Sequence, residues 1–215
     1  MTAQGAAGVS AASADTTPPV VVLLVGIPGA GKTTLIDRAG VNSPDWIVLD
    51  PDRIRRRLSP ALRRLPIPYP LYVVGIVVAI SRHTRVLVES RGTYAWLRRL
   101  VTACARVRRR RAVLVLLDAS SEAAVAGQVR RGRVVPARIM RLFISDWSAL
   151  LDGARSGALA AEGWSDVRIL TRAQASDVRD FGDLVRRPSA VGGAGAERGG
   201  SGDRTLEDAP GPPRD

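Results

Sequence analysis

The residues from Gly26 to Thr34, GIPGAGKTT, have the types and spacing that bind a polyphosphate. Gly26, Gly31, Lys32 and Thr33 fill the fixed positions of the pattern G-x-x-x-x-G-K-[ST]. Glycine lets the backbone wrap closely around phosphate oxygens, so that successive N–H groups form a nest for an anion. The expected nucleotide-binding residues are Gly26, Ile27, Pro28, Gly29, Ala30, Gly31, Lys32, Thr33 and Thr34.

Lys32 is the only lysine in the chain, and all other basic side chains except one histidine are arginines. An ammonium group is compact enough to enter a narrow loop, whereas a guanidinium group is broad and planar. The pattern therefore predicts that Lys32 binds the β- and γ-phosphates of a nucleotide and that the Thr33 hydroxyl binds Mg²⁺.

The elements around this loop follow an alternating pattern. An apolar strand at residues 20–25 precedes the loop, and a helix at 32–39 follows it and adds its positive N-terminal end to the anion site. Further apolar runs predict strands at 46–49, 84–90, 112–118 and 166–170. Helical spacing is found at 51–58, 71–83, 94–108, 120–131, 136–151 and 173–186. The Val and Ile content of 71–83 leaves a strand as the alternative there. Pro66, Pro68 and Pro70 predict a loop before this segment. This order predicts an α/β fold with a central parallel five-stranded sheet and helices on both faces.

The second predicted strand ends in Asp50, Asp52, Arg53 and Arg55, at the edge of the sheet where parallel α/β folds bind ligands. A carboxylate there can deprotonate an attacking hydroxyl, and an arginine can bind an anionic acceptor. Two registers, Asp50 with Arg53 and Asp52 with Arg55, offer the same spacing. The alternative for Asp50 is an N-cap of the helix that begins at Pro51.

GIPGAGKTT followed by a strand that ends in D-x-x-R resembles the P-loop kinases of the polynucleotide-kinase and zeta-toxin type, whose ATP-binding domain is AAA-like. The resemblance implies a P-loop NTPase fold with the P-loop strand in the centre and a lid that carries arginines. It also implies that Asp52 is the catalytic base and that Arg55 binds the acceptor. The register of Asp52 is preferred because Ile54 and Leu58 then take the buried positions of the helix.

Two further segments are similar to parts of these kinases. Glu89 ends the third strand, where the family has an acidic residue, and would bind Mg²⁺ through water or stabilise the P-loop; a structural role is the alternative. Residues 128–136, QVRRGRVVP, resemble the lid, so Arg130 and Arg133 would close over ATP and stabilise charge during transfer. The alternative is a solvated arginine-rich turn.

Composition limits the remaining classes of function. The chain has 215 residues, a formal net charge of +12 and one cysteine, Cys104. A single cysteine cannot form an internal disulfide and fits a reducing compartment, and Cys104 is expected to pack in a helix.

Residues 20–187 are expected to form one kinase domain, and residues 1–19 and 188–215 to be disordered tails. The longest apolar run, of about ten residues, is too short to span a membrane, so a cytoplasmic location is expected. The sequence has no Cys/His cluster for a structural zinc and no clear Ser/His/Asp set for hydrolysis.

These observations predict an enzyme that uses ATP and Mg²⁺ and transfers the γ-phosphoryl group to a hydroxyl of an acceptor. The acceptor is either a polynucleotide 5′-hydroxyl, which the basic charge favours, or a small molecule. A regulatory ATPase and a nucleic-acid-binding module without phosphotransfer are the alternatives. The arginine-rich run at 106–111 either contacts nucleic acid or is a solvated connection.

Overall fold

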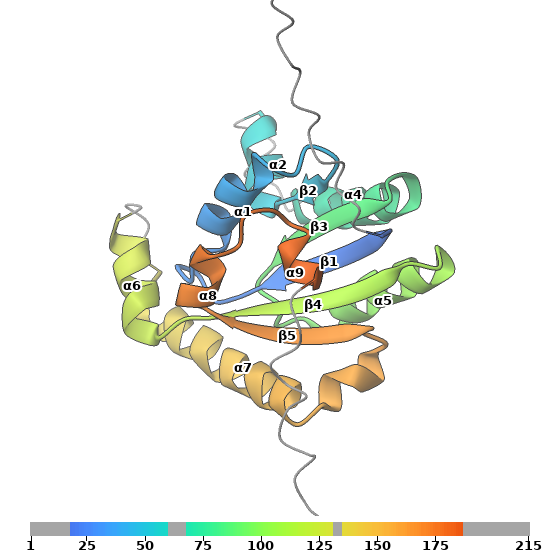
Figure 1. Cartoon of the computed structure of the whole chain (residues 1–215). Helices are drawn as coiled ribbons and strands as arrows, with labels where there is room; N and C mark the ends of the chain where they lie inside the picture. Colours follow the sequence, from blue (N-terminus) through green and yellow to red (C-terminus); the bar gives the residue numbers. More distant parts are fainter. Residues whose placement is uncertain (1–17, 60–67, 131–134, 187–215) are drawn as a thin grey trace, which may run out of the picture.

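A computed structural model describes residues 18–59, 68–130 and 135–186. Five strands form one sheet, and every neighbouring pair is parallel. The strand order is β2-β3-β1-β4-β5, with β1 in the centre (Figure 1). The strands are β1(Val20–Val25), β2(Ile47–Leu49), β3(Arg85–Ser90), β4(Arg111–Asp118) and β5(Asp166–Thr171). The predicted α/β fold with a central parallel five-stranded sheet is therefore confirmed.

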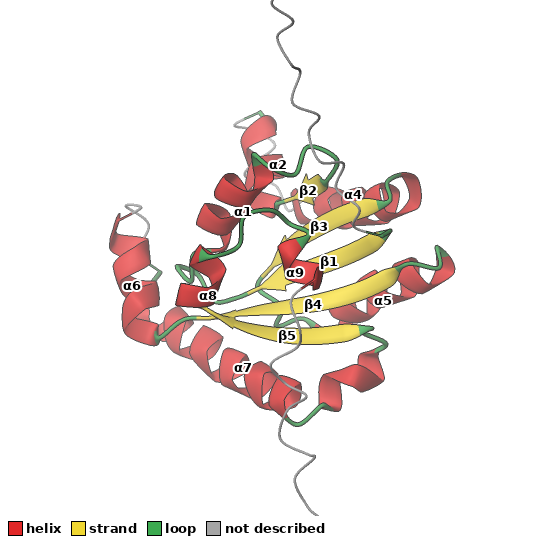
Figure 2. Cartoon of the chain, in the orientation of Figure 1, coloured by secondary structure: helices red, strands yellow, loops and turns green. Residues whose placement is uncertain are grey.

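Helices cover both faces of the sheet (Figure 2). In the view of Figure 1, α1, α8 and α9 lie on the near face, and α4 and α5 lie on the far face. The described helices are α1(Lys32–Gly40), α2(Pro51–Arg57), α4(Pro68–Arg82), α5(Ala95–Val107), α6(Ser121–Arg130), α7(Ala137–Arg155), the 3-10 helix η1(Ala158–Glu162), α8(Arg172–Ser176) and α9(Asp183–Arg186). Because both faces are covered, β1 is fully buried and β4 is buried through most of its length, which explains their continuous apolar sequences.

Most predicted elements match the observed ones to about one residue at each end, which is the ordinary uncertainty of element ends. The segment at 71–83 is a helix rather than a strand, and α4 begins earlier than predicted, at Pro68. The prediction of a loop at Pro68 and Pro70 is therefore wrong, and Pro66 lies outside the described residues. Proline is tolerated in the first turn of a helix because the N–H groups there have no partner within the helix.

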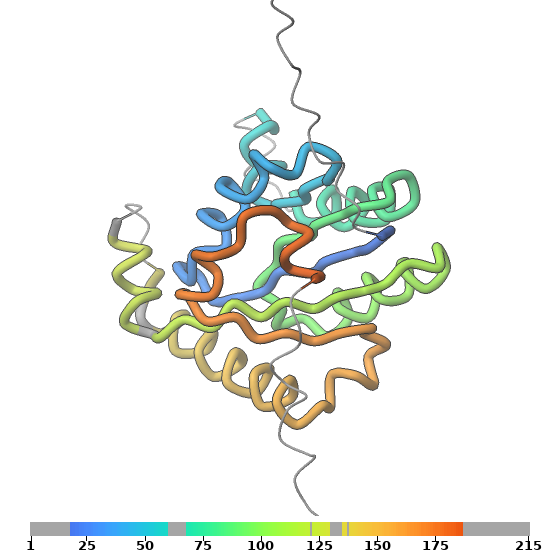
Figure 3. Tube along the Cα trace, viewed as in Figure 1, coloured from blue at the N-terminus to red at the C-terminus, as the bar shows by residue number. Residues whose placement is uncertain are grey.

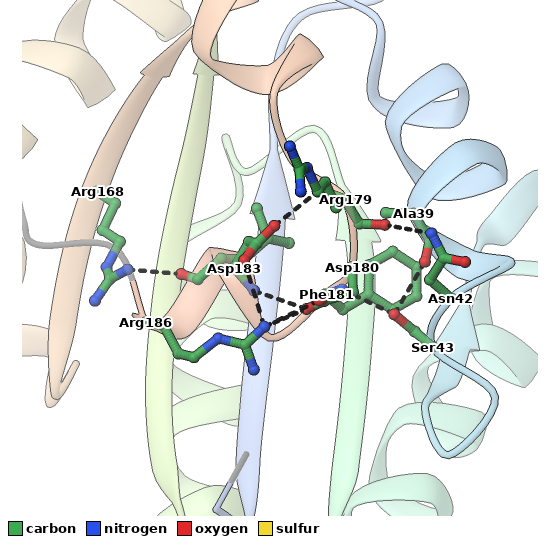
Figure 4. A network of polar contacts seen from close by, with 10 residues as sticks. Ala39, Asn42, Ser43, Arg168, Arg179, Asp180, Phe181, Asp183 and Arg186 are labelled. Atoms are coloured by element: carbon green, nitrogen blue, oxygen red, sulfur yellow. Dashed lines mark hydrogen bonds and ion pairs between the residues drawn. The ribbon is translucent and has the colours of Figure 1, made fainter. Parts of the chain in front are cut away.

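The prediction of one closing helix at 173–186 is wrong. The chain forms two short helices, α8 and α9, with a non-helical connection between them (Figure 4). In this connection the backbone N–H of Phe181 donates to Ser43 Oγ at 2.8 Å, and that of Asp183 donates to Asp180 Oδ1 at 3.0 Å. Side-chain acceptors thus replace helical hydrogen bonds. The turn buries Phe181 completely, edge-on to Trp46 with ring centroids 5.6 Å apart.

Other expectations concern packing and the ends of the chain. Helix α7 extends to Arg155, beyond the predicted end near 151. Cys104 is partly buried on α5, where burial raises the pKa of its thiol. None of the helices in the described ranges has the length and apolar character needed to cross a membrane. Residues 1–17 and 187–215, which include nearly all of the two predicted tails, lie outside the described residues, and the domain boundaries stay predictions.

Candidate active site

The glycine-rich loop connects β1 to α1 at the carboxyl edge of the sheet. Gly29 and Gly31 have φ angles of 90° and 108°, which side-chain-bearing residues rarely adopt. At Gly29 space is also lacking, since an added Cβ would lie 2.0 Å from the backbone oxygen of Ala124. The sequence pattern for a phosphate cradle thus corresponds to a loop that only glycine can form at these positions.

Lys32 is 8% exposed at the start of α1. Its Nζ donates to the backbone oxygen of Gly26 at 2.6 Å and to that of Ile27 at 3.4 Å. Glu89, at the end of the neighbouring strand β3, places Oε1 3.8 Å from the same Nζ. The ammonium therefore lies among loop carbonyls and a carboxylate, at the position from which it would contact phosphates in the loop.

A cavity of about 330 Å³ lies beside the loop. Its walls bring together most of the predicted site residues from four separate segments. They are Pro28, Gly29, Gly31, Lys32, Thr33, Asp50, Pro51, Asp52, Arg55, Glu89, Ser90, Arg91, Gln128 and Val135. We refer to it as the phosphate cavity. Of the other predicted nucleotide-binding residues, Ile27 and Ala30 are buried, and Ala30 and Thr34 both line another cavity.

The two candidate aspartates differ in their surroundings. Asp50 is 2% exposed, and its Oδ1 accepts hydrogen bonds from the backbone N–H groups of Asp52 at 2.7 Å and Arg53 at 3.3 Å, so it caps α2. Arg53 pairs with Asp37 at 2.6 Å. Asp52 and Arg55 line the phosphate cavity, and so does Asp50, whereas Arg53 does not. Both members of the pair border the cavity only in the register of Asp52 with Arg55.

A second cavity, of about 530 Å³, adjoins the first. The two share Pro51, Asp52, Arg55, Ser90 and Arg91. The sequence interpretation assigned none of the remaining walls to the site; they are Pro68, Tyr69, Tyr72, Tyr94 and Trp96. We call it the aromatic cavity. A signal was available, since Tyr94 and Trp96 directly follow the third strand at the same edge of the sheet.

Tyr72 connects α4 to the end of β3. Its ring is buried, and its hydroxyl donates to the backbone oxygen of Glu89. Burial, followed by the negative charge of Glu89 and the neighbouring Tyr69 and Asp50, raises the pKa of Tyr72 well above its usual value. The phenol therefore stays protonated and keeps this contact, which fixes the aromatic cavity relative to Glu89.

Arg98 holds the loop that follows β3. Its buried guanidinium donates to the backbone oxygen of Gly92 and to both carboxylate oxygens of Glu162, at 2.6 and 2.8 Å. Burial by itself would raise the pKa of Glu162, but hydrogen bonds from Arg98 and Trp164 and the charge of Arg98 lower it overall. The loop that carries Arg91 and Tyr94 is therefore anchored to η1.

Helix α6 packs directly on the phosphate-binding loop, beyond the carboxyl end of β4 (Figure 3). Gln128, which is 5% exposed, donates from Nε2 to the backbone oxygen of Pro28 at 3.0 Å and accepts at Oε1 from the N–H of Val135 at 2.9 Å. The predicted lid arginines follow at once. Arg130 is the last residue of α6, but its side chain and the whole of Arg133 lie outside the described residues.

The arginine-rich run at 106–111 lies at the opposite edge of the sheet. Arg111 begins β4, so the run is at the amino ends of the strands. Arg108 donates to the backbone oxygen of Ser81 at 2.8 Å, and Arg110 donates to that of His83. These arginines tie the end of α4 to the start of β4 and do not border either cavity.

A central parallel strand, a glycine-rich loop and a helix that begins with Lys-Thr-Thr define a P-loop NTPase. The family model described as "AAA domain" matches residues 21–142, which is more than half of the chain. The chain belongs to this family, and the resemblance identified in the sequence is confirmed.

Solved structures show the same fold at low sequence identity. A structure of the PezAT chromosomal toxin–antitoxin system of Streptococcus pneumoniae is similar with a TM-score of 0.56 and 16% identity, covering 74% of this chain and 69% of that one. A shikimate kinase from Acinetobacter baumannii gives 0.52 and 19%, covering 81% and 96%. A gluconokinase from Sinorhizobium meliloti 1021 gives 0.51 and 14%, covering 78% and 93%. A search of curated proteins finds no match.

Proposed function

We propose that residues 20–187 form an ATP- and Mg²⁺-dependent kinase that transfers the γ-phosphoryl group of ATP to a hydroxyl of an acceptor. The observation that carries the proposal is that Lys32 and Thr33, on the nucleotide side, border the same cavity as Asp52 and Arg55. Phosphoryl transfer depends mainly on positioning and on neutralising charge, and this cavity has groups of both signs around one space.

The nucleotide would extend from the phosphate cavity along the loop. The N–H groups of the loop and Lys32 would bind the β- and γ-phosphates. A further cavity of about 230 Å³ offers room for the nucleoside. Its walls are Ala30, Gly31, Thr34, Leu35, Arg38, Leu117, Arg172, Ala175 and Ser176. Both cavities contact Gly31, which supports one continuous binding path.

The side chains around the phosphate cavity fit Mg²⁺. The Thr33 hydroxyl and the Glu89 carboxylate are oxygen ligands of the kind that this ion prefers. Among the described residues there is no group of three or more His, Cys, Asp or Glu that could hold a metal, which suits an ion bound largely by phosphates and water. When bound, Mg²⁺ neutralises negative charge on the phosphates.

The roles of the remaining residues follow from their positions. Asp52 would accept the proton of the acceptor hydroxyl while Arg55 binds an anionic part of the acceptor or the transferring group. The bond from the γ-phosphorus to the oxygen that bridges to the β-phosphate breaks, the bond to the acceptor oxygen forms, and ADP leaves. Arg130 and Arg133 would stabilise the charge that develops during transfer.

The test is a γ-phosphate transfer screen with radiolabelled ATP over metabolites, nucleosides and 5′-hydroxyl oligonucleotides. Wild type is compared with Lys32→Ala, Asp52→Asn and the matched surface change Asp152→Asn on α7. We expect Lys32→Ala to abolish transfer. Asp52→Asn should lower turnover about 100-fold or more with little change in ATP affinity, because a general base contributes about that factor.

Two results would contradict the proposal. Tight ATP binding without transfer to any hydroxyl would favour a nucleotide-binding module, or a regulatory ATPase if ATP is hydrolysed. Wild-type turnover in Asp52→Asn would exclude Asp52 as the base. Asp152→Asn should behave as wild type, since Asp152 is exposed and distant in sequence from the cavity residues.

A further inference from the structure

The aromatic cavity is in direct contact with the groups proposed for catalysis. Asp52 and Arg55 form part of the wall of both cavities. A molecule in the aromatic cavity therefore lies next to Asp52, in a space that Thr33 does not line. A volume of about 530 Å³ is in the usual range for small-molecule sites.

The outer wall of this cavity is an open cluster of aromatic rings. The ring centroid of Tyr69, on α4, is 6.4 Å from that of Tyr94 and 6.0 Å from that of Trp96, at the start of α5. The three side chains are 40%, 50% and 46% exposed. Aromatic rings bury much apolar area and stack on flat partners. Solvent-exposed rings that line a cavity therefore favour the binding of a planar ligand.

Positive charge lies at the inner end of the same cavity. Arg55 and Arg91 both line it. Within the described ranges the Arg55 guanidinium makes no hydrogen bond or ion pair, and that of Arg91 lies over the Phe143 ring, 4.7 Å from its centroid. Burial and Tyr94 raise the pKa of Tyr69, whereas the charge of Arg91, which lines the same cavity, acts to lower it. Guanidinium groups bind carboxylate and phosphate in a bidentate manner.

The distribution of arginines favours a small molecule over a long nucleic acid. The arginine-rich run at 106–111 is at the amino ends of the strands, whereas both cavities are at the carboxyl ends. Its members Arg108 and Arg110 already bond to carbonyl groups of Ser81 and His83. This run therefore cannot extend a binding path that starts at Asp52.

We propose that the acceptor is a small molecule with a planar ring, held by Tyr69, Tyr94 and Trp96, and an anionic group, held by Arg55 and Arg91, with its hydroxyl beside Asp52. This inference rests on the proposed kinase function, because it identifies the class of its acceptor. Nucleoside monophosphates and hydroxylated aromatic carboxylic acids share the required chemistry, and the experiment separates them.

Trp96 provides a direct readout of binding. It is 46% exposed in the cavity wall, whereas Trp46, Trp147 and Trp164 are 5%, 4% and 7% exposed. Quenching of tryptophan fluorescence is measured without ATP, so the result does not depend on phosphoryl transfer. One panel contains adenosine, adenosine monophosphate and ribose 5-phosphate, and the other contains benzyl alcohol, 4-hydroxybenzoate and lactate. Oligonucleotides with a 5′-hydroxyl form the third panel, and Trp96→Phe identifies the signal that comes from Trp96.

We expect the probe with both ring and anion in one of the first two panels to bind about tenfold or more tightly than its ring-only and anion-only counterparts. Arg91→Gln should weaken the binding of the ring-and-anion probe by about tenfold and leave the affinity for the neutral ring-only probe unchanged. Tyr69→Ala should weaken every ring-containing probe by about tenfold, as the loss of one stacking partner does. The matched control Arg82→Gln, an exposed position at the end of α4, should change neither.

Three outcomes would overturn the inference. The first is that the anion-only probes bind as tightly as the ring-and-anion probes, and the second is that no ring-and-anion probe binds. The third is that oligonucleotides bind much more tightly than every mononucleotide, which would identify the acceptor as a polynucleotide end instead. If a ring-and-anion probe binds tightly but is never phosphorylated, the result contradicts the kinase function and still supports the proposed binding site. The two proposals therefore fail in different ways.

Discussion

A Cβ atom added to Gly127 would lie 2.6 Å from the backbone oxygen of Gly29, so α6 contacts the phosphate-binding loop with no room for a side chain between them. The next residue, Gln128, donates to the carbonyl of Pro28 in the same loop and accepts from the N–H of Val135. The helix that leads into the proposed lid is thus packed and hydrogen-bonded to the loop. A change in either one must be accommodated by the other.

Gly127→Ala tests this contact. The added methyl meets backbone rather than a flexible side chain, so α6 and the loop must move apart. We expect the free energy of unfolding to fall by about 1–3 kcal/mol, the usual cost of overpacking, and the affinity for an ATP analogue to fall as well. Urea denaturation and an equilibrium titration with the analogue measure the two effects.

The control is the same substitution at Gly153, in α7. A Cβ there would lie 3.6 Å from the Leu159 side chain, which is ordinary contact. Gly153→Ala should therefore leave stability unchanged or raise it by up to about 1 kcal/mol, because alanine favours the helix. If Gly127→Ala were as stable as Gly153→Ala and bound the analogue normally, the close packing of α6 on the loop would be wrong.

Substitution of Asp50 should mainly change stability, whereas substitution of Asp52 should mainly change turnover. Asp50→Ala removes the cap that accepts from Asp52 and Arg53, so unfolding should become easier by about 0.5–2 kcal/mol. Asp50→Asn should keep most of this stability because asparagine is also a good N-cap. Asp52→Asn should leave stability unchanged and lower turnover in the transfer assay.

The reverse pattern would assign the other register. Loss of turnover in Asp50→Asn, together with normal turnover in Asp52→Asn, would make Asp50 the base and would leave Asp52 as an exposed residue of the first turn of α2. Thermal unfolding and the transfer assay on the same three variants decide between the two registers.

How far the sequence predicts this protein depends on how local each determinant is. The buried strands β1 and β4 are continuous apolar runs, and the loop from Gly26 to Thr33 is a contiguous pattern, so both could be read directly. The wrong prediction at 173–186 has a distant cause, since the N–H of Phe181 finds its acceptor on Ser43, 138 positions away. Helical spacing in the local sequence carries no information about that partner.

The same limit applies to the candidate site. Asp52, Arg55 and Glu89 were predicted because each lies at the end of a strand or shortly after it, at one edge of the sheet, and the structure places them around one cavity. The aromatic cavity was missed because Tyr69 and Trp96 come from different helices that only the tertiary fold brings together. Their roles stay predictions until the variants are measured.

Ser43→Ala tests the contact that shapes the end of the chain. Ser43 is 4% exposed; its Oγ accepts from Phe181 and donates to the backbone oxygen of Ala39 at 2.9 Å. Its loss leaves the N–H of Phe181 without this acceptor in a buried position, which costs about 1–3 kcal/mol. Relative to wild type, Ser43→Ala should speed up hydrogen exchange in residues 177–186 more than in β1. Ser156→Ala, at an exposed serine, should change neither quantity.

The buried pair of Arg98 and Glu162 predicts a dependence of stability on pH. The folded state lowers the pKa of Glu162 below its unfolded value of about 4.3. The unfolded state therefore takes up a proton first as the pH falls, and protonation favours unfolding. The contribution of this carboxylate should be complete above the unfolded pKa and should be lost as the pH falls through the folded pKa.

Glu162→Gln isolates this contribution from that of other groups, including Asp183, whose pKa is also lowered. The difference in the free energy of unfolding between wild type and Glu162→Gln should be constant from about pH 5 to pH 7 and should shrink steadily below about pH 4. Urea denaturation at a series of pH values measures it. A difference that grew toward acidic pH would mean that folding raises the pKa of Glu162, and that Arg98 does not stabilise its charge.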